Sequence, residues 1–303
     1  MKFKNINLKS LIIILMQKNI IKVDDEKFLK ILYKRKFGKK LNLENPETFN
    51  EKMQWLKLYD RDDKYTNMVD KYESKKYVSN IIGEEYIIPT LGIWNKFEEI
   101  DFEKLPNQFV LKPTHTSGNV FICKDKTKIN YKKLKKRVNK WLKRKYYYTG
   151  REWPYKNIKP RIIAETYIEN QNEIGLRDYK FMCFNGKVKC SFVCSNRNSK
   201  EGLYVDFYDL KWNKMPFTRH YPNSREDIKK PINYEQMIKL SEKLALNIPF
   251  VRVDFYEANE KIYFGELTFY PGSGFEEFSP ERYDRILGDM LDLSKVKEEN
   301  NEE

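Results

Sequence analysis

Two strands joined by a short turn are predicted at residues 250–270, which read FVRVDFYEANEKIYFGELTFY. Side chains alternate between the two faces of a strand, so Arg252 and Asp254 share one face of the first strand. Glu266 and Thr268 share a face of the second in the same way. Polar groups within otherwise apolar strands are costly to bury unless something pairs with them. We therefore expect this hairpin to carry a functional site.

A divalent cation would relieve the repulsion between the two carboxylates of this hairpin, Asp254 and Glu266. Magnesium prefers hard oxygen ligands and usually binds through one or two carboxylates plus substrate phosphates. Arg252 beside them is suited to holding a phosphate or carboxylate oxygen. The same spacing is equally compatible with an Arg–Asp–Glu salt-bridge network on the face of a sheet, and both interpretations stay open at this point.

A loop of small residues, THTSGN at 114–119, follows Lys112 near the end of a predicted strand at 109–113. Free N–H groups in such a loop can surround a polyphosphate, and the lysine can neutralise it. The pattern GxxxxGK[ST] is absent, so this is not a Walker A loop. An ordinary turn leading into a second strand at 120–123 explains the same residues.

Helices are expected over most of residues 1–60, where Thr48 and Glu51 have the spacing of a capping box. A further helix is predicted at 68–82, closed by Gly83. Further along the chain we predict a strand, a hairpin that turns at Asn185-Gly186, and a helix, at residues 161–167, 179–194 and 234–247 respectively.

Residues 131–145 predict a basic amphipathic helix. Leu134, Val138, Trp141 and Leu142 fall on one face, while nine lysines and arginines and no acid occupy the rest. A solvated surface is one interpretation of the basic face. A surface for an anionic polymer or an anionic membrane is the other.

The composition narrows the class of protein. The 303 residues carry a formal charge of +14, which favours anionic partners but also fits a lysine-rich proteome. Four scattered cysteines without a CxxC pair, and two histidines, argue against zinc and for reduced thiols in the cytoplasm. A nucleic-acid partner is disfavoured, because the basic residues are helical and no run of exposed aromatics on a sheet accompanies them.

The N-terminus has basic residues before the apolar run at 11–16. This run is far shorter than the roughly 20 residues that span a bilayer. We expect a helix that packs on the body of the protein, with contact at the inner face of a membrane as the alternative. The predicted organisation is a helical region at 1–64, a main domain at 65–293 and a disordered acidic tail at 294–303.

The order of these features, over roughly residues 65–290, resembles the ATP-grasp superfamily. More narrowly, the chain resembles the TupA-like ATP-grasp family of teichuronopeptide and capsular polysaccharide biosynthesis proteins. Several phrases carry this resemblance, namely NPETFNEK at 45–52, KPTH at 112–115, GREW at 150–153, RIIAE at 161–165, DYKFMCFNG at 178–186 and GELTF at 265–269. The resemblance implies an α+β fold in which two lobes hold a nucleotide between them, preceded by a helical N-terminal region.

The resemblance also implies how ATP would be held. Lys71 and Lys112 would contact the α- and β-phosphates, and the loop that follows would close over them, with His115, Ser117 and Gly118 as its contributing residues. The hinge at 165–168 would read adenine, mostly through its backbone, at Glu165, Tyr167 and Ile168. Asp178 would meet the ribose hydroxyls, and Lys180 would lie on the same strand face near the phosphates.

The hairpin residues would supply the metal site and the reaction centre. Asp254, Glu266 and Thr268 would be magnesium ligands. Many relatives have asparagine where this chain has Thr268, which puts a second metal position in doubt. Arg252 would bridge the γ-phosphate and the bound carboxylate, so that Arg252, Lys112 and Lys180 form the catalytic set.

The implied chemistry converts a carboxylate into an acyl phosphate, which an amine attacks to give an amide. Positioning and charge neutralisation carry this reaction, without a covalent enzyme intermediate. The expected substrates are a carboxylated saccharide of the uronic-acid type and an amino acid. The aromatic, charged loop at 146–160, with Arg151, Glu152 and Trp153, is either part of the acceptor site or a structural lid.

Two other functions remain open. A glycosyltransferase of capsular polysaccharide synthesis would suit the basic surface, although no Asp-x-Asp motif lies between apolar strands. A degenerate, non-catalytic nucleotide-binding module is compatible with Thr268. Nucleotide hydrolysis that depends on both substrates distinguishes the ligase from these two.

Overall fold

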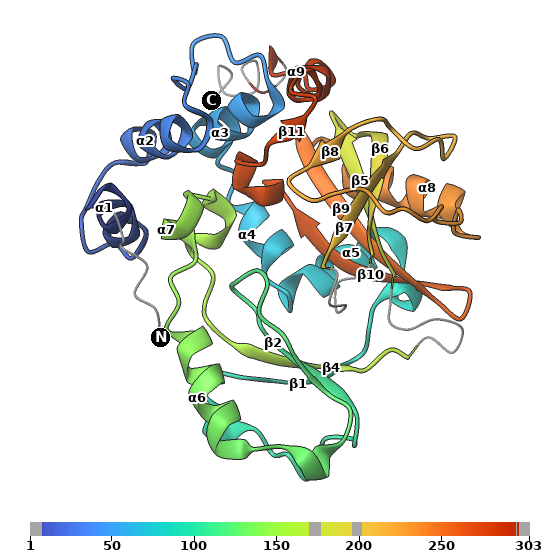
Figure 1. Ribbon diagram of the computed structural model, residues 1–303. Helices are drawn as coiled ribbons and strands as arrows, with labels where there is room; N and C mark the ends of the chain where they lie inside the picture. Colours follow the sequence, from blue (N-terminus) through green and yellow to red (C-terminus); the bar gives the residue numbers. More distant parts are fainter. Residues whose placement is uncertain (1–7, 170–176, 196–201, 295, 297–303) are drawn as a thin grey trace.

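The computed structural model describes residues 8–169, 177–195, 202–294 and 296. Its strands form a four-stranded sheet in the order β1-β4-β2-β3, a five-stranded sheet in the order β10-β9-β5-β6-β7 and a two-stranded β11-β8 pair (Figure 1). All the pairings are antiparallel. Helices accompany both larger sheets, and the predicted α+β class is confirmed.

The bounds of the elements follow the chain. The α-helices are α1 (Leu8–Gln17), α2 (Asp25–Phe37), α3 (Phe49–Tyr59), α4 (Lys64–Val69), α5 (Glu73–Ile82), α6 (Tyr131–Leu142), α7 (Tyr147–Gly150), α8 (Tyr234–Leu244) and α9 (Arg282–Asp289). The strands are β1 (Thr90–Trp94), β2 (Phe109–Pro113), β3 (Phe121–Cys123), β4 (Ile162–Thr166), β5 (Arg177–Phe184), β6 (Lys187–Ser195), β7 (Tyr204–Tyr208), β8 (Thr218–Arg219), β9 (Phe250–Ala258), β10 (Lys261–Thr268) and β11 (Phe278–Ser279).

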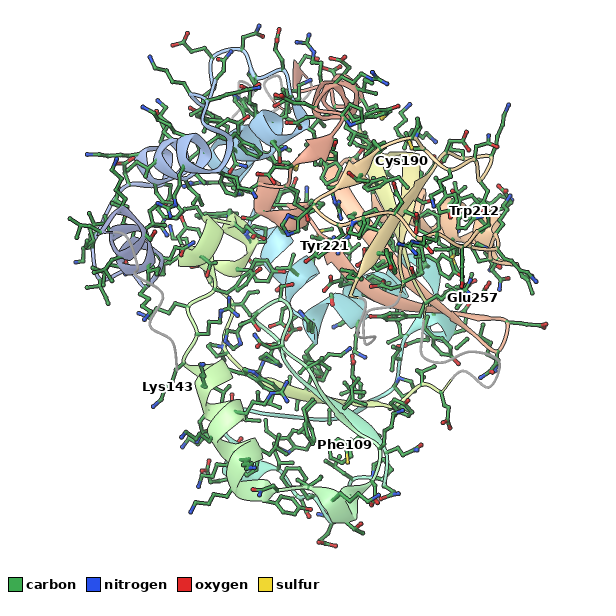
Figure 2. All side chains as sticks on the ribbon, viewed as in Figure 1. Phe109, Lys143, Cys190, Trp212, Tyr221 and Glu257 are labelled. Atoms are coloured by element: carbon green, nitrogen blue, oxygen red, sulfur yellow. The ribbon has the colours of Figure 1, made fainter. Side chains whose placement is uncertain are left out.

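The small lobe, residues 90–145 and 162–166, consists of the four-stranded sheet and α6 (Figure 1). Its core is separate from that of the rest of the chain and includes Phe109, which Figure 2 shows within this lobe. Leu134, Val138 and Trp141 of α6 are buried in the same core. The amphipathic helix and the hairpin of β2 and β3 are therefore both confirmed.

The large lobe is built on the five-stranded sheet, against which α8 packs (Figure 1). Both predicted hairpins are present, β5 with β6 and β9 with β10. Asn185 and Gly186 have φ of 46° and 79°, as a tight turn between β5 and β6 requires. A register shift at Gly265 brings Glu266 opposite Asp254, so the polar residues of β9 and β10 face one another.

The N-terminal helices adjoin the C-terminal end of the chain. The capping box of Thr48 and Glu51 is present at the start of α3. Lys52 Nζ donates to the carbonyls of Gly288 and Leu291, at distances of 2.8 and 2.7 Å, and so ties α3 to the end of α9. The boundary at residue 64 stays a prediction.

Helix α1 buries Ile13 and leaves Leu8 71% exposed. None of the helices in the described ranges has the length and apolar character needed to cross a bilayer. Of the predicted acidic tail, residues 295 and 297–303 lie outside the described residues.

The predicted helix at 68–82 is wrong in one respect, because it is divided into α4 and α5. Asp70 causes the break: its Oδ1 accepts hydrogen bonds from the backbone N–H groups of Tyr72 and Glu73, at 2.8 and 3.2 Å. An aspartate that bonds to nearby backbone competes with helix continuation. The break leaves Lys71 between two helices instead of on the surface of one.

Candidate functional site

A row of charged side chains crosses three neighbouring strands of the large lobe. The strand register pairs Lys180 of β5 with Asp254 of β9, and Asp254 with Glu266 of β10. Arg252 lies two residues from Asp254 and opposite Thr268. Residues paired in this way point to the same face of a sheet. The spacing read from the sequence therefore corresponds to a cluster in space.

Ion pairs join this row. The Arg252 guanidinium donates from Nε and Nη2 to the two oxygens of Asp254, at 2.6 and 2.7 Å, and from Nη2 to Glu266 Oε1 at 3.1 Å. The Lys180 ammonium pairs with Asp254 and also, at 2.6 Å, with Asp178. Arg252 Nη2 donates to the Thr268 hydroxyl at 2.9 Å. The salt-bridge network predicted from the hairpin is therefore present. It is formed by the same side chains that are proposed as magnesium ligands, so the geometry is compatible with both interpretations.

Glu266 lies at the electrostatic centre of this row. Burial favours the protonated acid, but the charges of Lys71, Arg252, Lys180 and Lys112 outweigh it and lower the pKa of Glu266 to about 2. Burial would likewise lower the pKa of Arg252, whereas Asp254 and Glu266 raise it. The centre therefore holds an ionised Glu266 among four cationic side chains, an arrangement suited to anionic ligands.

Lys71 reaches this centre from the break between α4 and α5. Its Nζ donates to the Thr116 carbonyl at 2.7 Å, and its backbone N–H donates to the Thr114 carbonyl at 3.2 Å. Burial lowers the pKa of Lys71, and the negative charge of Glu266 opposes that effect. Lys71 thus connects the loop of the small lobe with the carboxylates of the large lobe.

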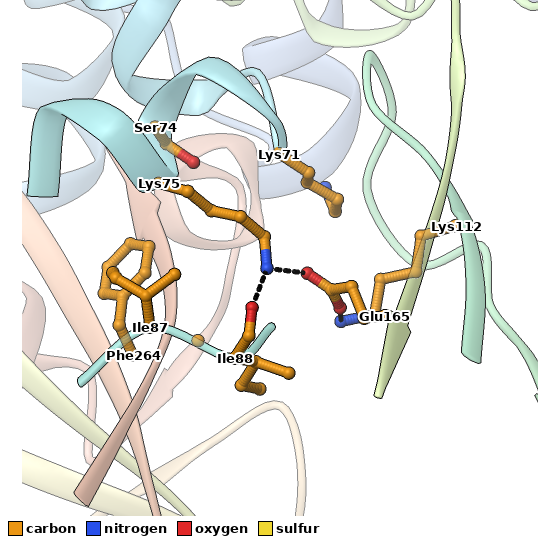
Figure 3. Close-up of a pocket in the computed structure, with 9 residues that line it drawn as sticks. Lys71, Ser74, Lys75, Ile87, Ile88, Lys112, Glu165 and Phe264 are labelled. Atoms are coloured by element: carbon orange, nitrogen blue, oxygen red, sulfur yellow. Dashed lines mark hydrogen bonds and ion pairs between the residues drawn. The ribbon is translucent and has the colours of Figure 1, made fainter. Parts of the chain in front are cut away.

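Glu165 forms a second charged cluster, between the lobes. Its two oxygens accept from Lys75, at 2.7 Å, and from Lys112, at 2.5 Å (Figure 3). Burial would raise the pKa of Glu165, but the two ammonium groups lower it to about 2. These three side chains and Lys71 line a small pocket together with Ile87, Ile88 and Phe264 (Figure 3). Lys75 was not among the site residues predicted from the sequence. Its position four residues after Lys71, one turn along a helix, could have indicated it.

The loop after β2 divides into a buried and an open part. The His115 ring is buried, and its Nε2 lies 3.1 Å from the Trp141 carbonyl of α6. Ser117 is half-buried, while Gly118 is exposed with φ of 76° and free space around its Cα. Ser117 and Gly118 are therefore placed at the loop tip, whereas the His115 side chain points into the small lobe.

The predicted adenine hinge, residues 165–168, begins in the last two residues of β4 and continues beyond the strand. Tyr167 and Ile168 are half-buried, and the Lys124 ammonium lies 5.9 Å from the centre of the Tyr167 ring. Asp178 is buried at the start of β5 beside Lys180. The residues assigned to adenine and ribose thus come from different lobes, at the end of β4 and on β5.

The oxygen donors of the hairpin fit magnesium in kind. Asp254 and Glu266 supply two carboxylates on adjacent strands, with the Thr268 hydroxyl 3.4 Å from Glu266 Oε1. Within the described ranges, no group of three or more His, Cys, Asp or Glu side chains is arranged as a metal site. Phosphate oxygens and water would complete such a set, as is usual for magnesium.

The loop at 146–160 approaches the same centre from the other side. Arg151 is fully buried and pairs with Asp25 at 3.1 Å, which anchors the loop to α2. The next residue, Glu152, is 6% exposed and interacts electrostatically with both Glu266 and Arg252. Lys57 of α3 is fully buried beside it. The sequence offered one signal for Lys57, since it follows Met53 by four residues on the inner face of the helix.

Comparison with known proteins gives one family. The family described as TupA-like ATP-grasp matches residues 51–292. Among solved structures, the chain is similar to D-alanine–D-alanine ligase from Bacillus anthracis complexed with ATP, with 17% identity, a TM-score of 0.47 and coverage of 78% of this chain and 69% of that one. The D-alanine–D-alanine ligase from Helicobacter pylori has 17% identity, a TM-score of 0.40 and coverages of 82% and 70%. The D-cycloserine synthetase DcsG has 12% identity, a TM-score of 0.38 and coverages of 75% and 71%. No curated protein gives a significant match.

Proposed function

The chain belongs to the TupA-like ATP-grasp family, and from this premise we propose that it is an ATP- and magnesium-dependent carboxylate–amine ligase. The proposed substrates are a uronic-acid-type saccharide and an amino acid, joined during the synthesis of a cell-surface polysaccharide. The observation that supports the proposal is the group of four cationic side chains around Glu266. They come from both lobes and from the break between α4 and α5. Such a centre suits a polyphosphate and a carboxylate bound side by side.

In the proposed reaction the carboxylate attacks the γ-phosphorus of ATP, and the bond to the β,γ-bridging oxygen breaks to release ADP. Lys71 and Lys112 neutralise the phosphates, while Lys180 and Arg252 stabilise the charge that develops on the transferred group. Magnesium, held by Asp254, Glu266 and Thr268, supplies further neutralisation when bound. The amine then attacks the acyl phosphate, so that a C–N bond forms and inorganic phosphate leaves.

Residues on the edge between the lobes would hold the rest of the nucleotide. Backbone groups at 165–168, with Tyr167 and Ile168, would contact adenine, and Asp178 would contact the ribose. Ser117 and Gly118 would cover the phosphates from the loop tip, and His115 would contribute through its backbone, because its ring is buried. Glu165 would act by positioning Lys75 and Lys112.

A trapping experiment tests the reaction directly. The protein is incubated with ATP, magnesium, hydroxylamine and either glucuronate or galacturonate, because hydroxylamine converts an acyl phosphate into a stable hydroxamate. The expected result is hydroxamate and ADP in equal amounts, dependent on the uronate and lost in Arg252→Met. ADP release without a carboxylate would contradict the ligase. Cleavage of a sugar nucleotide in the absence of ATP would instead favour the glycosyltransferase, and binding of ATP without turnover would favour the non-catalytic module.

A further inference from the structure

Lys57 is a lysine side chain with no access to solvent, and burial lowers its pKa to about 7 although the negative charge of Glu152 opposes that effect. Its Nζ donates three hydrogen bonds, to Gln54 Oε1 at 2.9 Å, to the Ser273 carbonyl at 2.7 Å and to the Ser273 hydroxyl at 3.1 Å. The Phe275 ring lies 4.7 Å from the same nitrogen. A lysine ammonium has three donors, so all of them are in use. Lys57 therefore has no donor left for a ligand and serves as a support.

Ser273 links Lys57 to Glu152 through hydrogen bonds. The Ser273 hydroxyl accepts from Lys57 and hydrogen-bonds the Glu152 carboxylate. Ser273 and Glu152 both lie close to Gly150, where an added Cβ would be 2.1 Å from Ser273 Oγ and 3.4 Å from Glu152 Oε1. The backbone of Ser273 has φ of 57°, a left-handed conformation that is unusual for residues other than glycine. The Glu152 carboxylate thus lies where three segments meet, namely the loop at 146–160, the turn after β10 and α3.

Glu152 keeps acceptor capacity that this network does not fill. Among the described residues no lysine or arginine forms a direct ion pair with it; Lys57 acts on it electrostatically and is bridged to it by the Ser273 hydroxyl. A carboxylate offers about four lone-pair sites. Burial raises the pKa of Glu152 and the negative charge of Glu266 adds to this effect, while the charges of Lys57 and Arg252 and the hydrogen bond with Ser273 offset only part of it. A buried acid in this setting is stabilised by a cation that comes from outside the chain.

Two aromatic side chains of the same loop, Tyr146 and Tyr155, interact with Glu152. Tyr146 and Tyr155 contact each other edge to face, with ring centroids 4.7 Å apart. Both hydroxyls interact electrostatically with Glu152 and with Glu266. Rings beside a carboxylate favour an ammonium ion, because both groups attract it and the rings exclude water. A metal ion would instead require additional oxygen ligands.

We propose that Glu152, held by Ser273 and Lys57, binds the ammonium group of the amine substrate beside the Arg252–Glu266 centre. This inference rests on the proposed ligase function and assigns the loop at 146–160 to the acceptor. In this arrangement Glu152 accepts hydrogen bonds from the ammonium, while Arg252 contacts the activated carboxylate. The attacking nitrogen is thereby oriented before its proton is lost.

The test measures the melting temperature of the full chain with saturating ATP and magnesium, during titration with methylammonium chloride. Tetramethylammonium, which has no N–H donor, is the ligand control. The variants are Glu152→Gln, Ser273→Ala and, as a matched control on the surface, Glu44→Gln. The expected result is a saturable stabilisation by methylammonium in wild type and Glu44→Gln, at least tenfold weaker in Ser273→Ala and absent in Glu152→Gln.

The ATP response in the same experiment separates this inference from the ligase proposal. Glu152→Gln should keep the wild-type stabilisation by ATP and magnesium, since Glu152 is placed on the acceptor side. Equal responses of wild type and Glu152→Gln to methylammonium would overturn the ammonium site, as would an equal response to tetramethylammonium or no response in wild type. If ATP and magnesium did not stabilise the wild type, the proposed ligase function would be overturned instead. Should Glu152→Gln not fold, Ser273→Ala decides the question through the same titration.

Discussion

Asp254 shows how a single residue can be read in two ways. Its oxygens accept from Arg252 and from Lys180, so the carboxylate is satisfied within the protein and is 1% exposed. The same oxygens have lone pairs that a metal can share. Residue spacing identified this cluster, because alternation on a strand fixes which side chains meet. The ion pairs with β5 could not be predicted from spacing within the hairpin, since they depend on which strand lies beside β9.

Removal of the Arg252 guanidinium tests the energetic role of the network. Arg252→Met leaves Asp254 buried with one cationic partner fewer, and breaking a buried pair in this way typically costs about 3–5 kcal/mol. The free energy of unfolding, measured by urea titration at pH 7, should fall by an amount of this order. Arg285→Met serves as the control, because the Arg285–Asp289 pair is on the surface, and it should change little. Equal effects of the two substitutions would show that the buried network is not stabilising.

Glu165 should make stability depend on pH. Its pKa is about 2 in the folded protein, against an ordinary value of 4.5, because Lys112 and Lys75 outweigh the effect of burial. The stabilisation is therefore fully present above pH 4.5 and is lost as the pH falls toward 2. A shift of this size corresponds to on the order of 3 kcal/mol. In Glu165→Gln the free energy of unfolding should fall less steeply over this window than in wild type.

The pH experiment has a direct control in Glu103→Gln, which removes an exposed carboxylate of the same lobe. Its pH profile should match that of the wild type. If Glu165→Gln also retained the wild-type slope, the ion pairs with Lys112 and Lys75 would not contribute to folding as described.

Among the helices and strands, the helical character of the N-terminal region could be predicted from the sequence, but the packing of its helices on the rest of the protein could not. The capping box defined where α3 begins, because it pairs specific backbone N–H groups. The break at Asp70 was missed, since an aspartate within a helical pattern gives no local sign that its side chain will bond to the backbone ahead. The packing of α3 on α9 involves residues more than two hundred positions apart, and local pattern carries no information about such contacts.

Gly288 should be essential for that packing. An added Cβ there would lie 2.2 Å from the Glu47 carbonyl oxygen and 2.8 Å from the Phe49 nitrogen, so α9 and the start of α3 would have to separate. Gly288→Ala should lower the free energy of unfolding by at least 1–3 kcal/mol, the usual cost of overpacking. Asp289→Ala, one residue along and exposed, should have little effect. A melting temperature for Gly288→Ala equal to that of wild type would contradict the close approach.

At the scale of the whole molecule, two sheets and a set of helices bring together residues from distant parts of the chain (Figure 1). Lys112 and Glu165 come from the small lobe, whereas Asp254 and Glu266 come from the large one. Their order along the sequence was sufficient for the family resemblance and the class of fold. The role of Lys57 was not accessible in this way, because its burial depends on how α3, the turn after β10 and the loop at 146–160 meet in space.

ATP with magnesium is expected to bind where the two lobes meet. The most direct measurement is the melting temperature with and without both, for wild type and for the double substitution Asp254→Asn with Glu266→Gln. A ligand at a hundredfold excess over its dissociation constant stabilises the folded state by about 2.7 kcal/mol. The melting temperature of the wild type should rise with ATP only when magnesium is present, and that of the double variant should not rise. No increase with ATP, accompanied by an increase with a sugar nucleotide such as UDP-glucose, would contradict this expectation.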